Sequence, residues 1–397
     1  MNIGIVTTWF ERGAAYVSRQ YMDALKSNPA NTVYVYARGG ESYAKGDKKW
    51  DTEGVTWGKP SKKYYAGVTS IDKQDFHQWI NKNAIDIILF NEQNWWIPVL
   101  WCKEWGVKTG TYVDYYTEET VPLFAAYDFI LCNTERHFRL FKDLSQSYYI
   151  PWGTDTNLFK VDDRKQREEV VFFHSSGMNP HRKGTECTLR AFLSLKDLSA
   201  ARLIIHTQIP LAAELQKLID NSNQKVELIV DTVTAPGLYH TGDVYVYPSI
   251  LDGLGLTVAE ALSCGLPCIV PNNAPMNEFV KEDFLGRIAS VEYLYARSDG
   301  YYWPQCKVSI DSVKQQMQYY IENKLNLAEI QQKVRRYAEE NYNWEDRYNM
   351  INQIFSEVKV LPLGNDTKMS IEQYERRNNG KFNIIPYLFY YWKKYRK

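Results

Sequence analysis

Short apolar runs alternate with segments of helical period along most of this chain. The runs read as strands, and they cover residues 3–7, 32–37, 85–90, 107–113, 129–133, 170–174, 202–206, 226–230, 244–247 and 268–270. Apolar residues recur at helical spacing between many of them, over residues 14–25, 134–144, 185–195, 211–221, 235–240 and 257–264. Strands that alternate with helices predict an α/β chain with doubly wound parallel sheets.

The pattern changes at two places, and these suggest domain limits. A stretch rich in helix breakers, residues 149–159, is followed by the charged run 162–169, so we place a boundary at about residue 165. Two long helical patterns, 309–325 and 327–341, precede a further helix that ends near residue 358. The predicted parts are residues 1–164, 165–343 and 344–397.

Residues 243–280 carry the clearest candidate chemistry. A strand stopped by Pro248 leads through a loop containing Gly253 and Gly255 into a helix. Glycines let backbone N–H groups approach a ligand closely, and a helix start carries partial positive charge, so this loop predicts an anion site, most naturally for phosphate. Asp252 and Glu260 bracket the loop, and an acid beside phosphate is better suited to the hydroxyls of a ribose or sugar. The alternative is a tight turn that needs glycines, with Glu260 capping the helix.

A second loop of this kind precedes the helical pattern at 185–195. Arg182 and Lys183 are adjacent cations at the expected helix start, where a cation is unfavourable unless an anion lies between it and the helix. This placement predicts a bound phosphate, and the alternative for Lys183 is an exposed surface cation.

The stretch Asp252 to Glu260 resembles the acid-x7-acid signature of retaining glycosyltransferases of family four, the glycosyl transferases group 1. The usual form begins Glu-Gly-Phe-Gly-Leu, whereas this chain has Asp252 for the first acid and Leu254 for the aromatic residue. Gly177, Lys183 and Gly184 match the family's Gly-Arg-x4-Lys-Gly pattern. Met178 stands where its Arg is expected, and Arg182 is a candidate substitute. Residues 150–155 also resemble the family's interdomain signature.

The resemblance implies a GT-B fold, in which two Rossmann-like domains enclose a cleft. The first domain would bind the acceptor and the second a UDP- or GDP-linked sugar, with retention of configuration and without a metal ion or other cofactor. The implied catalytic residues are Asp252, Lys183, Glu260 and Asp114, where Asp114 follows a position that holds Val113 instead of the usual His. The implied donor-binding residues are Gly13, Gly177, Arg182, Lys183, Gly184, Gly253, Leu254, Gly255, Leu256, Thr257 and Glu260. Glu92 and Gln93, after the strand at 85–90, are candidate acceptor contacts or a solvated loop.

Composition narrows the choice of partners. The 397 residues have 45% hydrophobic and 24% charged content and a formal net charge of zero, which argues for a globular chain and against nucleic acid as the main partner. The six cysteines form no CxxC pair, and no apolar run approaches the ~20 residues of a membrane span, so a cytoplasmic protein is expected. The histidines and acids show no metal-ligand spacing.

The C-terminal end, residues 382–397, is aromatic and basic. Such a segment suits an anionic membrane surface, and it predicts a peripheral contact at the inner face of a membrane. The alternative is that its aromatic side chains pack on the first domain. For function, the alternatives are a GT-B phosphorylase or epimerase and a non-catalytic sugar- or nucleotide-binding protein.

Overall fold

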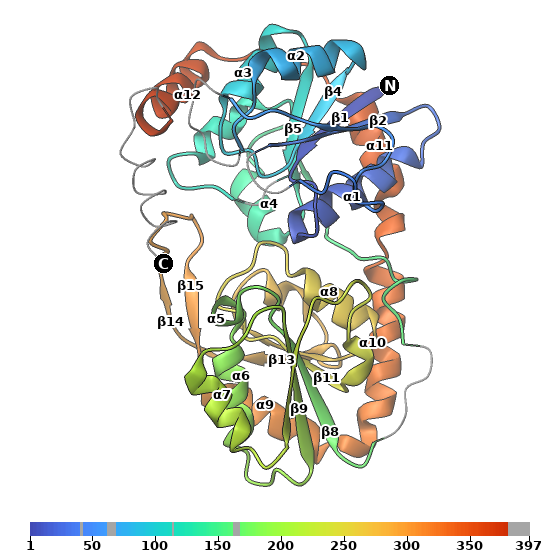
Figure 1. Cartoon of the computed structure of the whole chain (residues 1–397), viewed down its shortest axis with the longest axis vertical. Helices are drawn as coiled ribbons and strands as arrows, with labels where there is room; N and C mark the ends of the chain where they lie inside the picture. Colours follow the sequence, from blue (N-terminus) through green and yellow to red (C-terminus); the bar gives the residue numbers. More distant parts are fainter. Residues whose placement is uncertain (40–42, 62–68, 113–114, 162–166, 380–397) are drawn as a thin grey trace. The chain divides into compact units, whose positions relative to one another are not determined.

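The computed structural model describes residues 1–39, 43–61, 69–112, 115–161 and 167–379 (Figure 1). The chain forms two compact units. Unit 1 comprises residues 1–133, 137–150 and 346–397, and unit 2 comprises residues 134–136 and 151–345. The domain boundary expected near residue 165 lies outside the described residues, and so does the basic aromatic end, 382–397.

Unit 1 contains a seven-stranded sheet in the order β3-β2-β1-β4-β5-β6-β7, and all its strand pairs are parallel. Its central strands are buried along nearly their whole length, as expected for a parallel sheet covered on both faces. The strands are β1 (Asn2–Thr7), β2 (Thr32–Ala37), β3 (Val55–Trp57), β4 (Ile87–Phe90), β5 (Lys108–Tyr112), β6 (Phe129–Cys132) and β7 (Ser147–Tyr149).

Helices connect these strands, and two further helices come from the end of the chain. The amide of Asn352 donates to the carbonyl oxygen of Ala24 at 2.8 Å, which joins α11 to α1. Glu375 accepts the backbone N–H of Trp96 at 2.8 Å and thereby caps α3 from α12. The helices are α1 (Gly13–Lys26), α2 (Lys73–Lys82), α3 (Ile97–Glu104), η2 (Val121–Ala126), α4 (Glu135–Phe141), α11 (Tyr348–Glu357) and α12 (Asn365–Asn378), where η marks a 3-10 helix and α4 begins within the segment assigned to unit 2.

Unit 2 contains a six-stranded parallel sheet in the order β10-β9-β8-β11-β12-β13 and a separate antiparallel hairpin, β14-β15. The hairpin is bonded to the loop that follows β11, because the N–H of Cys306 donates to the carbonyl oxygen of Ile250 at 2.9 Å. The strands are β8 (Val170–Ser175), β9 (Ala201–Thr207), β10 (Val226–Val230), β11 (Val244–Val246), β12 (Cys268–Pro271), β13 (Gly286–Ala289), β14 (Val291–Tyr295) and β15 (Gln305–Val308).

Side chains of β11 alternate between the two faces of the unit 2 sheet. Val244 and Val246 belong to a core that also contains Leu189 of α6 and Met317 of α9, whereas Tyr245 lies on the opposite face. Figure 1 shows helices flanking this sheet. The helices of unit 2 are α5 (Pro180–Lys183), α6 (Thr185–Leu193), α7 (Ala213–Asp220), η3 (Tyr239–Thr241), α8 (Leu256–Ser263), η4 (Met276–Phe279), α9 (Ile310–Glu322), η5 (Lys324–Asn326), α10 (Leu327–Asn341) and η6 (Trp344–Arg347), which ends in unit 1.

The two parallel sheets confirm the predicted doubly wound fold. One predicted helix, at 235–240, is wrong: that stretch contains Pro236 and Gly237, whose φ is +73°, and only the 3-10 turn η3 follows. A second difference concerns residues 180–183. They form the separate helix α5, because Gly184 adopts a left-handed φ of +78° and divides α5 from α6.

Candidate functional site

The loop between β11 and α8 holds the first acid of the predicted pair. Gly255 precedes α8 with a left-handed φ of +74°, and no side chain of the described residues caps the helix start. Asp252 turns one oxygen back into the loop, where its Oδ1 accepts the N–H of Gly253 at 2.8 Å. The first turn of α8 therefore presents backbone N–H groups that no side chain of the described residues caps, as an anion site requires.

Lys183 is paired with this acid. Its Nζ lies 2.6 Å from Oδ2 of Asp252, and the two side chains are only 15% and 13% exposed. The hydroxyl of Tyr247 accepts from Lys183 and donates to Oδ2 of Asp252, so three side chains form a closed hydrogen-bonded ring. The ammonium also lies 4.9 Å from the centre of the Tyr247 ring.

The charges of this ring shift one another's pKa. Burial opposes ionisation of Asp252, but the neighbouring positive charges of Lys183 and Arg182 outweigh it and hold the pKa of the carboxyl well below its usual range. For Lys183, burial is the largest influence and lowers its pKa, while Asp252 counteracts this effect. The ion pair therefore favours the charged forms of both Asp252 and Lys183.

Gly184 explains how Lys183 reaches this loop. A Cβ atom on Gly184 would lie 2.2 Å from the carbonyl oxygen of Pro248, so only glycine allows the two backbones to approach this closely. The N–H of Ile250 donates to the carbonyl oxygen of Arg182 at 2.9 Å, and the guanidinium of Arg182 donates to the carbonyl oxygen of Leu251 at 3.3 Å. The two predicted loops are thus hydrogen-bonded to each other within unit 2.

The two cations were expected at the start of a helix, but they lie at the end of one. Arg182 and Lys183 end α5, where cations are favourable with respect to the helix dipole. The position of Lys183 therefore does not require a bound phosphate, because Asp252 already supplies its counter-charge. Met178, which stands where the resembled family has an Arg, is 72% exposed.

The second acid is held by a tyrosine from a distant part of the sequence. Oε2 of Glu260, in α8, accepts the hydroxyl of Tyr239 at 2.5 Å. Burial raises the pKa of Glu260, and the hydrogen bond from Tyr239 partly offsets that effect. Glu260 does not cap α8, since the helix start makes no side-chain cap bond.

Sequence reasoning missed three residues around this loop. Tyr239 and Tyr247 contact the two acids, as described above. Arg136 is 5% exposed, and within unit 2 it donates to the carbonyl oxygen of Asp252 at 2.9 Å. The strand pattern 244–247 places Tyr245 and Tyr247 on one face, but nothing local in the sequence pointed to Tyr239 or to the burial of Arg136.

The remaining predicted site residues are distributed over both units. Gly177 lies between β8 and α5 with a left-handed φ of +53°, and its carbonyl oxygen accepts the N–H of Gln208 at 2.9 Å. Leu254 is buried, and Leu256 and Thr257 form the first turn of α8. Gly13 is exposed and begins α1 in unit 1, and Asp114 lies outside the described residues.

The two candidate acceptor contacts of unit 1 differ in their surroundings. The side chain of Gln93 is buried: its amide nitrogen donates to the carbonyl oxygens of Thr69 and Trp95, and its oxygen accepts from Arg38 at 2.9 Å. Glu92 has a φ of +50° and pairs with an arginine of unit 1 at 3.4 Å. Gln93 is therefore committed to the internal structure of unit 1.

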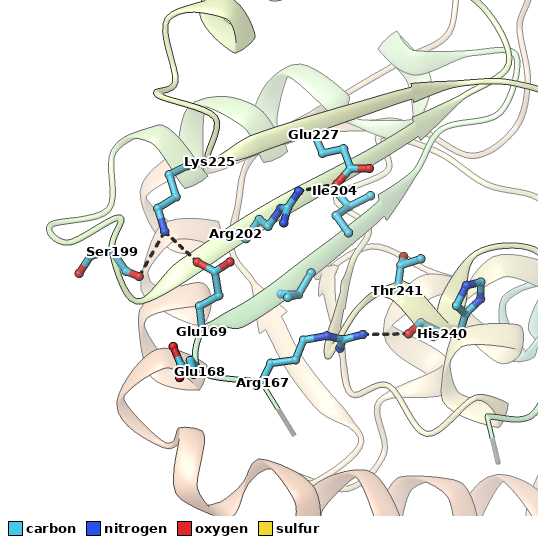
Figure 2. Close-up of a pocket in the computed structure, with 11 residues that line it drawn as sticks. Arg167, Glu168, Glu169, Ser199, Arg202, Ile204, Lys225, Glu227, His240 and Thr241 are labelled. Carbon is cyan, nitrogen blue, oxygen red and sulfur yellow. Dashed lines mark hydrogen bonds and ion pairs between the residues drawn. The ribbon is translucent and has the colours of Figure 1, made fainter. Parts of the chain in front are cut away.

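A pocket of about 860 Å³ lies elsewhere in unit 2, near the amino ends of β8, β9 and β10 (Figure 2). Four of its charged side chains form ion pairs: Lys225 with Glu169 and Arg202 with Glu227, each at 2.7 Å. Ligands of open parallel sheets bind at the carboxyl ends of the strands, where Asp252 lies, so this pocket is not the candidate site.

Neither a metal cluster nor a membrane-spanning helix occurs in the part of the chain that the structure describes. Among those residues, no group of three His, Cys, Asp or Glu side chains could hold a metal ion. In the same residues, no helix has the length and hydropathy required to cross a bilayer.

Residues 168–301, which include the whole Lys183–Asp252–Glu260 constellation, match the model of the family described as glycosyl transferases group 1. The match to this family covers 134 of the 397 residues of the chain. An Escherichia coli relative, a UDP-Gal:alpha-D-GlcNAc-diphosphoundecaprenol alpha-1,3-galactosyltransferase, is 33% identical over 90 residues, or 23% of this chain and 22% of that protein. A GDP-mannose-dependent alpha-(1-6)-phosphatidylinositol dimannoside mannosyltransferase of Mycobacterium tuberculosis is 25% identical over 171 residues, 40% of this chain and 45% of that protein.

The solved structures are similar to this chain in fold. A glycosyltransferase from Rickettsia africae superposes with a TM-score of 0.70 at 16% identity, over 90% of this chain and 99% of that one. Together with the two parallel sheets, this likeness shows the GT-B fold. The curated relatives are each matched over less than half of their own length.

Proposed function

We propose that this protein is a retaining, metal-independent glycosyltransferase that moves a sugar from a nucleotide-diphosphate sugar to a hydroxyl of a glycan or glycolipid. The observation that carries the proposal is the Lys183–Asp252 pair, which lies beside the open start of α8 at the carboxyl end of β11. A family model covering this stretch supports the same reading.

The donor is proposed to bind in unit 2. Its diphosphate would meet Lys183, Arg182 and the first-turn N–H groups of α8, which together offer positive charge without a metal ion. Glu260 would accept hydrogen bonds from ribose hydroxyls, and Asp252 would contact the transferred sugar. As phosphate charge develops on the leaving group, these donors would stabilise it. Retention follows if that phosphate takes the proton of the attacking hydroxyl on the same face, as the family resemblance implies.

The acceptor is proposed to be lipid-linked or a related glycan. Two relatives are named for such acceptors, a diphosphoundecaprenol and a phosphatidylinositol dimannoside. The basic aromatic residues 382–397 are proposed to bring the protein to an anionic membrane surface from the cytoplasmic side. Pelleting with vesicles that contain anionic lipid, with and without residues 382–397, tests that contact, and equal pelleting of both forms rejects it.

The reaction is tested by incubating the protein with a panel of UDP- and GDP-linked sugars and following nucleotide release. We expect release with at least one donor, and its loss in Lys183→Ala. Lys196→Ala is the matched control, because it removes an exposed lysine of the same unit. Absence of release with every donor, combined with unchanged nucleotide affinity in Lys183→Ala, would reject the proposal and favour a protein without transferase activity.

Nucleotide affinity provides a test of Glu260 that does not require turnover. A buried hydrogen bond to a charged group contributes about 1.5–3 kcal/mol, so Glu260→Ala should weaken nucleotide binding by about 10-fold or more. Calorimetry with UDP and GDP measures the change, and unchanged affinity for both would remove Glu260 from the site.

A further inference from the structure

Three tyrosines pack in a row next to the loop between β11 and α8. Tyr245 and Tyr247 have ring centres 5.6 Å apart and nearly parallel rings, and Tyr239 meets Tyr245 edge-on at 5.6 Å. Tyr245 and Tyr247 are fully buried, and Tyr239 is 5% exposed. The period of two along β11 explains why Tyr245 and Tyr247 share a face, and η3 brings Tyr239 to the other end of the row.

The two outer tyrosines each donate a hydrogen bond to one acid of the pair. Tyr247 donates to Oδ2 of Asp252, the same oxygen that Lys183 contacts. Tyr239 donates to Oε2 of Glu260 at 2.5 Å. Among the described residues, Tyr245 makes no hydrogen bond to either acid. A phenol that donates to a carboxylate fixes its orientation and stabilises its ionised form.

These contacts have different consequences because the two acids face different groups. Tyr247 touches both the cation and the acid of the Lys183–Asp252 pair. When Lys183 turns toward a donor diphosphate, the hydroxyl of Tyr247 is the remaining side-chain donor that holds Oδ2 of Asp252 in the ring described above. Tyr239 instead donates to one oxygen of Glu260, and no hydrogen bond from the described residues reaches the other oxygen.

We propose that Tyr239 and Tyr247 are positioning residues with separate tasks: Tyr239 sets nucleotide affinity through Glu260, and Tyr247 sets the transfer step through Asp252 and Lys183. The inference rests on the proposed transferase function and deepens it. It also accounts for the shorter first acid, because the hydroxyl of Tyr247, the residue that follows β11, donates to the carboxylate of Asp252.

The test compares three substitutions that each remove a single hydroxyl group: Tyr239→Phe, Tyr247→Phe and Tyr245→Phe. Tyr245→Phe is the matched control, because it deletes the hydroxyl of the central ring, which is equally buried. A hydrogen bond to a charged group is worth about 1.5–3 kcal/mol, which corresponds to about 10- to 100-fold in an equilibrium or rate constant.

We expect Tyr239→Phe to raise the nucleotide Kd and the donor KM by about 10-fold while kcat stays within about three-fold. Tyr247→Phe should lower kcat by about 10-fold or more while nucleotide Kd stays within about three-fold. Because the Tyr247 hydroxyl stabilises the carboxylate, its removal should also move the acid limb of the kcat profile to higher pH. A general loss of packing would not produce this shift.

The outcomes separate the two proposals. If the wild-type protein turns over a donor and both outer variants behave like Tyr245→Phe, the positioning role is wrong and the transferase function stands. The same conclusion follows if Tyr239→Phe and Tyr247→Phe change kcat and KM in the same way. If the wild type releases no nucleotide from any donor and binds neither UDP nor GDP, the proposed function fails and the inference fails with it.

Discussion

Removal of Lys183 should destabilise unit 2, and most of that effect should depend on Asp252. In Lys183→Ala, Asp252, whose side chain is only 13% exposed in the wild type, would lose its ion-pair partner. Loss of one partner from a buried pair costs about 3–5 kcal/mol, whereas loss of both costs much less. We therefore expect each of Lys183→Ala and Asp252→Ala to lower the free energy of unfolding by about 3 kcal/mol or more, and the double variant to lose clearly less than their sum.

The pH dependence of the same variants follows from the sign of the pKa shift. Asp252 has a pKa depressed in the folded protein, so its pairing contributes stability above the unfolded value of about 3.9 and loses it as pH falls. In Lys183→Ala most of this contribution disappears, because only Arg182 remains as a nearby positive charge, and the buried carboxyl gains from protonation. The destabilisation measured at pH 7 should therefore shrink as the pH approaches 4.

Urea unfolding combined with amide hydrogen exchange in β11 and α8 measures the stability of unit 2 itself. Lys196→Ala serves again as the control and should stay within about 0.5 kcal/mol of wild type. Additive losses, with a coupling free energy below about 0.5 kcal/mol in the double-variant cycle, would refute the view that Lys183 and Asp252 form a buried, mutually dependent pair.

Two further predictions concern packing and protonation. Gly184→Ala should destabilise unit 2 by more than the ~1–2 kcal/mol of a left-handed residue alone, because its Cβ would lie 2.2 Å from the carbonyl oxygen of Pro248. Thermal unfolding of both variants measures the difference. Gly237→Ala, where φ is +73° and the nearest heavy atom lies 3.7 Å from the added Cβ, should lower the stability less, and equal losses of stability in the two variants would contradict this account. Burial raises the pKa of Glu375 to about 7, so unit 1 should lose stability as pH rises from about 4.3 through 7, by up to a few kcal/mol. Glu375→Gln should flatten this dependence between pH 5 and 8, and an unchanged slope would refute the assignment.

The alternation of strands and helices could be predicted because parallel strands buried on both faces leave continuous apolar runs in the sequence. The spacing of Asp252 and Glu260 around a glycine loop likewise placed both acids at the carboxyl end of a strand. Elements without such runs were missed. The hairpin β14-β15 and the helix α12 have mixed polarity, and the helix α2 has one buried stripe that the polar residues around it obscure.

The partners of the site residues could not be predicted, because they come from distant parts of the chain. Lys183 meets Asp252 across 69 positions and Arg136 meets it across 116. The short helix α5 was also missed, although Pro180 and Gly184 mark its two ends. Reading these residues as one helix placed the cations at the wrong terminus.

Asp252 neutralises the charge of Lys183 before any ligand binds. An external anion must outcompete a carboxylate that is held 2.6 Å from the ammonium. A chloride or acetate ion carries no more charge than Asp252 already supplies, whereas a nucleoside diphosphate carries more charge and can also contact the start of α8. We therefore expect the site to resist the small anions of the cell, so that selection for a diphosphate begins with the competition for Lys183.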